Sequence, residues 1–156
     1  MKGEQGMIPL IIPSYEPDER LLQLLNTLRD YPFGPVLLVN DGSGPVYQTF
    51  FDRAKELLQE KLILLSHEVN RGKGRALKTA FAYVLEHFPD AAGCVTADSD
   101  GQHSAAAIES IAQGLGKHPE SLILGMRTFD GDEIPWKSRF GNTITMSVFS
   151  YIAGTK

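Results

Sequence analysis

Two aspartates and a glutamine near residue 100 are the residues in this sequence best suited to chemistry. Asp98, Asp100 and Gln102 lie two positions apart, directly after the apolar run 92–97. In an extended backbone, residues two apart point the same way, so the two carboxylates are expected to face the same space. Like charges at short range raise one pKa unless a cation lies between them, and oxygen ligands suit Mg²⁺ or Mn²⁺. The structural alternative is that Asp98 caps the strand and Asp100 begins a turn with Gly101.

A third carboxylate follows another apolar run. Asp41 comes after residues 35–39 and directly before Gly42. A carboxylate at the end of a buried strand can accept hydrogen bonds from a base or a ribose, as acidic residues do in dinucleotide sites. The alternative is an Asp-Gly turn with no ligand.

The segment 70–75, Asn-Arg-Gly-Lys-Gly-Arg, has the features of an anion site at the start of a helix. Glycines such as Gly72 let a ligand approach the backbone, Lys73 adds positive charge, and helix N-termini favour anions. The spacing matches neither a Walker A loop nor a G-x-G-x-x-G fingerprint. A flexible basic turn is the alternative interpretation.

Four further side chains allow two interpretations each. Arg127 and Arg139 are either bidentate phosphate ligands or solvated surface arginines. His103 is either a metal or donor contact or a residue that caps the next helix. Trp136 is either an aromatic that faces an acceptor or an anchor for its loop.

Short apolar runs alternate with helical patterns, which predicts a three-layer α/β/α domain with an open, mostly parallel sheet. The predicted strands are 7–12, 35–39, 61–65, 92–97 and 121–125. Pro17 is expected to open the first helix, and a last helix is expected over 139–152. Ligands of such sheets bind beyond the carboxyl ends of the strands. The polar clusters fall there, at 13–16, 40–43, 67–74 and 98–103.

Length and composition indicate one globular domain over residues 1–156, with a net charge of −4 that offers no basic footprint for nucleic acid. Cys94 is the single cysteine and is expected to be a buried small side chain. The first residues do not form a signal peptide, and no apolar run approaches the ~20 residues that cross a bilayer.

Five segments together resemble the family-2 inverting glycosyltransferases of GT-A fold, and among them the polyprenyl- or dolichyl-phosphate hexosyltransferases. The segments run in the order of the family over almost the whole chain: 11–15 (IIPSY), 39–43 (VNDGS), 70–74 (NRGKG), 98–103 (DSDGQH) and 125–127 (GMR). Each motif is weak alone, and their joint order and spacing make the match specific.

The resemblance implies a metal-dependent transfer of a hexose, with inversion, from a nucleotide sugar of the UDP-glucose or GDP-mannose class to a polyprenyl phosphate. It implies that Mg²⁺ or Mn²⁺ is bound by Asp100 and Gln102, with Asp98 beside the metal and the nucleotide. It also implies that Arg127 and Arg139 contact the acceptor phosphate. The residues expected to bind the donor are Pro13, Tyr15, Glu16, Asp41, Gly72, Lys73 and Asp98.

The chain departs from the family pattern in two places. Glu16-Pro17 replaces the common Asn-Glu after the first strand, and the chain ends at Lys156 before the segment that completes the acceptor side in the family. The expectation is therefore a domain cut short at its C-terminus, without the membrane helices that many relatives carry. The full-length protein is expected in the cytoplasm, at the inner face of the membrane, with a role in the cell envelope.

Three alternatives from other classes stay open. A haloacid-dehalogenase-type phosphatase also has Asp-x-Asp-Gly after a strand, but Gln102 and the late position of the motif argue against it. A sugar-1-phosphate nucleotidyltransferase should carry a glycine-rich, arginine-containing loop where this chain has 13–15. The third alternative is a fragment that binds a nucleotide sugar without turnover.

Overall fold

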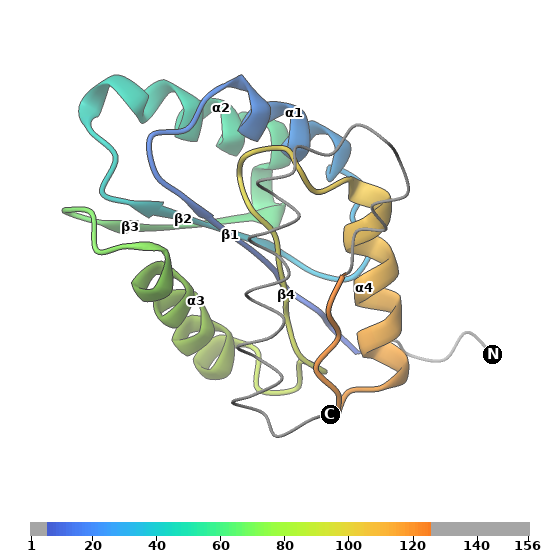
Figure 1. The fold of residues 1–156 in the computed structure, drawn as a ribbon. Coiled ribbons are helices and arrows are strands. Elements are labelled where there is room, and N and C mark those ends of the chain that lie inside the picture. Colours follow the sequence, from blue (N-terminus) through green and yellow to red (C-terminus); the bar gives the residue numbers. More distant parts are fainter. Residues whose placement is uncertain (1–5, 126–156) are drawn as a thin grey trace, which may run out of the picture. The chain divides into compact units, whose positions relative to one another are not determined.

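The structure is a computed structural model that describes residues 6–125, in which four parallel strands form one sheet in the order β3-β2-β1-β4 (Figure 1). The strands are β1 (Leu10–Ser14), β2 (Val36–Asp41), β3 (Leu62–His67) and β4 (Val95–Thr96). The α-helices are α1 (Glu19–Thr27), α2 (Gln48–Leu58), α3 (Lys73–His87) and α4 (Ala105–Lys117), with the short 3₁₀ turns η1 (Pro45–Tyr47) and η2 (Gln59–Lys61).

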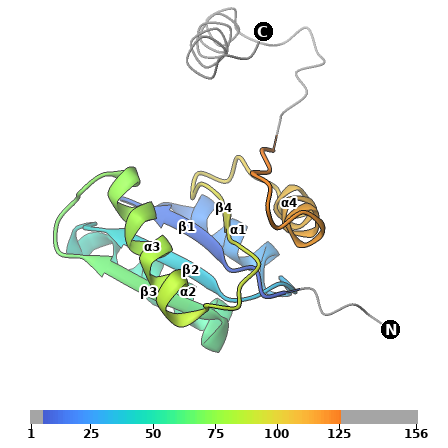
Figure 2. The same ribbon diagram turned by 90° about the horizontal axis from the view of Figure 1, so that it is seen from below.

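Alternating side chains of the central strands divide the core into two parts. Leu10 and Ile12 of β1 belong to the cluster that includes residues of α1, α2 and α4. Ile11 lies between them in sequence and belongs to the cluster on the other face, which α3 covers. Figure 1 shows α1 and α2 above the sheet and α3 below it, and in Figure 2, seen from below, α3 lies in front of the strands. The predicted three-layer α/β/α sheet is therefore confirmed in the described residues.

Strand β1 extends through a proline that was expected to end it. The predicted strand was 7–12, but the observed strand begins at Leu10 and continues to Ser14, with Pro13 in register with Val39 of β2. The carbonyl of Ile11 accepts a hydrogen bond from Ala97, on the β4 side. Alternate residues of a parallel strand direct their backbone groups to the same neighbour, so those of Pro13 face the β4 side, as those of Ile11 do. Pro13 lies beyond the last hydrogen bond to β4, and its missing N–H therefore removes no hydrogen bond to β2.

The helices that follow the strands begin with different caps. Pro17 was expected to open α1, but α1 begins two residues later, with Asp18 accepting a hydrogen bond from the backbone N–H of Arg20 at 2.9 Å. Ser104 caps α4 in the same manner. Helix α3 begins after Gly72, which has φ +86° and supplies no side-chain cap. The first N–H groups of α3 are therefore not bound by a capping side chain.

The β4 edge is shorter than predicted, and the predicted fifth strand does not form. Within the predicted run 92–97, only Val95 and Thr96 are sheet residues, although Ala92 and Ala97 also donate backbone hydrogen bonds to the β1 side. Residues 121–125 have no strand assignment, and Leu122 and Leu124 are largely exposed. A two-residue edge strand offers few backbone groups for a neighbour to pair with, so the apolar run 121–125 does not pair with the sheet.

Three other expectations concern single features of the chain. Cys94 is partly rather than fully buried, and burial raises the pKa of its thiol. Across residues 6–125, the structure has no helix of the length and apolarity needed to cross a membrane. The predicted helix over 139–152 lies outside the described residues.

Candidate functional site

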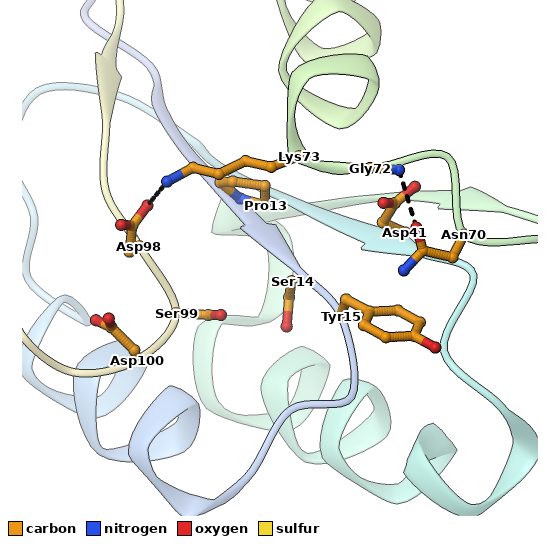
Figure 3. A pocket seen from close by; sticks show the side chains of 10 residues that line it. All are labelled: Pro13, Ser14, Tyr15, Asp41, Asn70, Gly72, Lys73, Asp98, Ser99 and Asp100. Atoms are coloured by element: carbon orange, nitrogen blue, oxygen red, sulfur yellow. Dashed lines mark hydrogen bonds and ion pairs between the residues drawn. The ribbon is translucent and has the colours of Figure 1, made fainter.

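A pocket of about 350 Å³ lies at the carboxyl ends of β1, β2 and β4 (Figure 3). It draws residues from all four polar clusters that the sequence placed at this edge. The lining residues are Pro13, Ser14, Tyr15, Asp41, Asn70, Gly72, Lys73, Asp98, Ser99 and Asp100. The parallel strands bring these clusters together because their carboxyl ends share one edge of the sheet.

Asp41 is the last residue of β2, and its side chain is only 4% exposed. Its Oδ1 lies 2.6 Å from Nδ1 of His67 and accepts a hydrogen bond from the backbone N–H of Arg71 at 3.0 Å. Burial acts to raise the pKa of Asp41, but the His67 contact and the N–H groups of Arg71 and Gly72 outweigh it and lower the pKa. Asp41 is therefore a carboxylate at neutral pH, held in place by protein donors.

The turn that contacts Asp41 also packs tightly on its neighbour Gly42. Gly42 has φ +73°, and a Cβ at this position would lie 2.1 Å from the carbonyl carbon of Val69. Only glycine fits both the conformation and the space. Asn70 then accepts a hydrogen bond from the N–H of Gly72 at 2.9 Å, as Figure 3 shows. The turn therefore reaches the pocket in one defined conformation.

The first-strand turn is joined to the second-strand turn by serine and asparagine side chains. Ser43 Oγ accepts from the backbone N–H of Glu16 at 2.9 Å, and Asn40 Oδ1 accepts from the N–H of Ser43 at the same distance. Tyr15 lines the pocket and is 48% exposed. A hydrogen bond with Glu16 is the largest cause of the raised pKa of Tyr15. Glu16 itself, expected to contact the donor, has φ +49° and does not line the pocket.

Asp98 forms an ion pair with a lysine at the place where a metal was expected. Nζ of Lys73 lies 2.5 Å from Oδ1 of Asp98, and the two side chains are 59% and 39% exposed. Exposed pairs of this kind contribute between about 0 and 1 kcal/mol. The lysine is therefore a weakly held partner of Asp98.

Asp100 lies in a turn and not in the extended backbone that the sequence analysis assumed. β4 ends at Thr96, Ser99 and Asp100 form a turn, and Gly101 has φ +73°. Oδ1 of Asp100 accepts from the N–H of Gln102 at 2.9 Å, so the turn alternative correctly described the backbone. Both aspartates line the pocket. In Figure 3 the carboxylate of Asp98 points toward Lys73, whereas the carboxylate of Asp100 does not.

The remaining candidates near the aspartates stand farther from the pocket. Gln102 is exposed and is not a lining residue. Nδ1 of His103 accepts a hydrogen bond from the N–H of Asp98 at 3.4 Å, and Ser104, not His103, caps α4. Within the described range 6–125, no three or more His, Cys, Asp or Glu side chains are grouped to hold a metal ion. Arg127, Arg139 and Trp136 lie outside the described residues.

Two residues of this site, Ser14 and His67, lie in the predicted polar clusters but were not singled out as candidates. Ser14 is 2% exposed, lines the pocket, and has the one buried side-chain oxygen or nitrogen without a hydrogen-bond partner in the described part of the chain. His67 ends β3 in register with Asp41. A polar residue at the end of an apolar strand was the available signal for His67, and nothing in the sequence marks the oxygen of Ser14 as unpartnered.

The comparison with protein families identifies this chain. The model of the family described as Glycosyl transferase family 2 matches residues 10–154. That match covers nearly the entire sequence, so the chain belongs to glycosyl transferase family 2 and is a transferase domain.

Relatives and a solved structure agree with this assignment. UDP-N-acetylglucosamine–dolichyl-phosphate N-acetylglucosaminyltransferase of Methanococcus voltae is 27% identical over 95% of this chain and 63% of its own length. The uncharacterized glycosyltransferase YaiP of Escherichia coli is 32% identical over 78% of this chain and 32% of its own length. The chain therefore spans less than two thirds of each of these relatives.

A solved structure shares the fold. The mannosyltransferase PcManGT from Pyrobaculum calidifontis, in complex with GDP-Man and Mn²⁺, aligns with a TM-score of 0.58 over 73% of this chain and 32% of that one. The sequence identity is 19%, so the similarity shows the GT-A fold and nothing finer.

Proposed function

We propose that this chain is the donor-binding part of an enzyme that transfers a hexose from a nucleotide sugar to a polyprenyl phosphate. The observation that carries the proposal is one pocket with two unlike sides. Tyr15 and Asp41 offer an aromatic face and a buried carboxylate, whereas Lys73, Asp98 and Asp100 offer charged groups that are less buried. A nucleotide sugar needs both, because its base and ribose require stacking and hydrogen bonds and its diphosphate requires cations.

The donor is proposed to lie along the carboxyl edge of the sheet. The exposed ring of Tyr15 supplies the stacking surface, and Pro13 and Asp41 bound the nucleoside end. Lys73 and the first N–H groups of α3, which have no side-chain cap, face the diphosphate. The unpartnered Oγ of Ser14 is a buried polar atom that a bound ligand would satisfy.

The oxygen ligands that line the pocket suit a divalent cation that is also bound by the substrate. Asp98 and Asp100 both line the pocket, and Mg²⁺ is bound in proteins by one or two carboxylates together with substrate phosphates. Asp98, Asp100 and, from the resemblance, Gln102 would hold Mg²⁺ or Mn²⁺. When bound, the metal supplies charge stabilisation for the departing diphosphate. The Mn²⁺ in the Pyrobaculum calidifontis structure supports this proposal.

The proposed reaction is a displacement at the anomeric carbon of the sugar by the acceptor phosphate. An oxygen of the acceptor phosphate forms a bond to that carbon as the bond to the nucleoside diphosphate breaks, which inverts the configuration. A phosphate monoester has its second pKa near 6, so the attacking oxygen is already anionic at neutral pH and needs no strong general base. The dolichyl-phosphate acceptor named for the Methanococcus voltae relative supports this choice of acceptor.

The acceptor side is proposed to use residues beyond the described range. Arg127 and Arg139 would hold the acceptor phosphate by charge-assisted hydrogen bonds. Because the acceptor is a lipid, transfer would take place at a membrane surface, on the cytoplasmic side. The domain over 1–156 would supply the donor half of the reaction, with further acceptor contacts in a longer chain.

Calorimetric titration of the chain with nucleotide sugars tests the proposal. UDP-glucose, UDP-N-acetylglucosamine and GDP-mannose are each titrated with Mn²⁺ and, in parallel, with EDTA. The expected result is Mn²⁺-dependent binding of at least one donor. Binding of no donor under either condition, or rapid hydrolysis of a generic phosphate ester, would contradict the proposal and favour the phosphatase alternative.

A further inference from the structure

The imidazole of His67 is a buried polar group that the proposed donor binding does not use. The side chain is 7% exposed and lies at the end of β3, in register with Asp41 of β2. Its Nδ1 lies 2.6 Å from Asp41 Oδ1, and its Nε2 lies 2.9 Å from Oγ1 of Thr79 in α3. Both ring nitrogens therefore have a partner, and each partner comes from a different element.

The chemistry of the partners decides the role of each nitrogen. The lowered pKa of Asp41 keeps it ionised, and a carboxylate only accepts hydrogen bonds. Nδ1 of His67 must therefore carry a proton and donate it to Asp41. Nε2 forms a hydrogen bond with the hydroxyl of Thr79, which can act as donor or as acceptor. The ring is thus fixed in orientation by contacts on both sides.

The same oxygen of Asp41 also holds the turn that forms part of the pocket. Oδ1 accepts from the N–H of Arg71, and the adjacent Gly42 packs directly on Val69. Asn70, Gly72 and Lys73 follow in this turn and line the pocket. A change in the direction of the Asp41 carboxylate would therefore move one wall of the pocket.

We propose that His67 is a positioning residue for the donor pocket. It donates to Asp41 and bridges to Thr79, and it thereby fixes both the carboxylate and the turn 70–73 in the arrangement that a nucleotide sugar requires. The inference rests on the proposed function, and it assigns a role to a residue that contacts no substrate itself.

Two substitutions separate the two contacts of the ring. In His67→Asn, the amide nitrogen lies at the reach of Nδ1 and can still donate to Asp41. In His67→Gln, the amide lies one bond farther out, at the reach of Nε2, so the bond to Asp41 is lost and the contact with Thr79 is kept. His87→Gln is the matched control, because His87 is exposed and lies at the other end of α3.

The measurement is the dissociation constant of whichever nucleotide sugar the wild type binds. It is made in the presence of Mn²⁺, at a temperature well below the melting temperature of every variant. We expect His67→Gln to bind about tenfold more weakly, since a hydrogen bond to a buried carboxylate is lost. His67→Asn should stay within about threefold of the wild type, and His87→Gln should equal it. Equal weakening in both His67 variants, or in neither, would overturn the inference.

A second measurement needs no variant and covers the case in which His67→Gln does not fold. Nitrogen-15 spectra of the histidine rings are recorded during a titration of the wild type with the donor and Mn²⁺. We expect Nδ1 of His67 to carry its proton both in the free protein and at saturation, because its bond to Asp41 is kept throughout. Donor binding by a protein whose His67 carries its proton on Nε2 alone contradicts the inference alone. A wild type that binds no donor contradicts the proposed function first, and the inference with it.

Discussion

The two acidic regions of the pocket are built in opposite ways. Asp41 ends a six-residue strand inside the sheet, is 4% exposed, and accepts hydrogen bonds from His67 and Arg71. Asp98 follows an edge strand of two residues and is 39% exposed. Its carboxylate contacts a single exposed lysine, and Asp100 bonds only within its own turn in the contacts that the structure shows.

This difference indicates which part of the site the protein completes by itself. Around Asp41, paired strands and close backbone contacts set the geometry before any ligand arrives. At Asp98 and Asp100, the protein brings oxygen ligands to one place but leaves their final arrangement open. A charged ligand is what would complete the second region, and the four predictions that follow test this contrast in order of expected size.

The largest effect is expected from adding a methyl group beside Asp41. In Gly42→Ala the new Cβ meets the Val69 backbone in a left-handed conformation, which should cost about 2–4 kcal/mol of unfolding free energy. Gly101→Ala is the matched change in the other region, where φ is also +73° but the nearest atom is Cβ of Arg20 at 3.3 Å. We expect about 1–2 kcal/mol there. Urea unfolding measures both, and equal costs would contradict the contrast.

A change nearly as large is expected in metal-dependent donor binding when the Asp100 carboxylate is removed. Asp100→Asn should weaken Mn²⁺-dependent donor binding by about a hundredfold, because the carboxylate charge proposed to hold the cation is lost. The melting temperature should stay close to that of the wild type, since Asp100 bonds within its own turn. Asp90→Asn, with the same change of charge at an exposed site after α3, should bind the donor normally. Calorimetry with Mn²⁺ and with EDTA distinguishes the variants.

Asp41→Asn should instead act on stability, in a pH-dependent manner. The folded pKa of Asp41 lies below its ordinary value of 3.8, so the charged side chain stabilises the fold above that pH. We expect the variant to lose about 1–3 kcal/mol at neutral pH. The difference from the wild type should shrink as the pH falls below 3.8 and Asp41 takes up a proton. Unfolding between pH 7 and pH 3 checks this, and a difference independent of pH would contradict it.

The smallest expected effect comes from removing the lysine that pairs with Asp98. Lys73→Met should tighten Mn²⁺ binding in the absence of nucleotide by up to about fivefold, because an exposed ion pair contributes at most about 1 kcal/mol. The signal of free Mn²⁺ in electron paramagnetic resonance measures this affinity. Lys78→Met, on an exposed part of α3, is the control and should leave Mn²⁺ affinity unchanged. Weaker Mn²⁺ binding in Lys73→Met would show that the lysine does not compete with the metal.

The sequence predicted the part of the fold that depends on burial. The buried strands β1 and β2 and the helix α3 follow directly from apolar periodicity, and the polar residues after them were correctly expected at one edge. The strand over 121–125 was wrong, although its short apolar run resembles those of the observed strands. An apolar run shows which side chains could be buried, but a strand also needs a neighbour with free backbone groups, and β4 offers two residues.

The candidate site divides in the same way. Residue types and order predicted that Asp41, Gly72, Lys73, Asp98 and Asp100 would line one pocket. They did not predict that Lys73 would reach Asp98, because two segments 25 residues apart meet only through the sheet. The turn at Asp100 was weighed but not preferred, since the extended backbone of the strand was assumed to continue past Thr96. The roles of these residues in binding stay predictions.

The contrast between the two regions is tested most directly by a crystal structure of this chain with its donor and Mn²⁺. We expect Lys73 to leave Asp98, and both Asp98 and Asp100 to turn toward the cation and the diphosphate. The contacts of Asp41 with His67 and Arg71 should keep their present lengths. A complex in which Lys73 still holds Asp98 while the Asp41 contacts have broken would contradict this account.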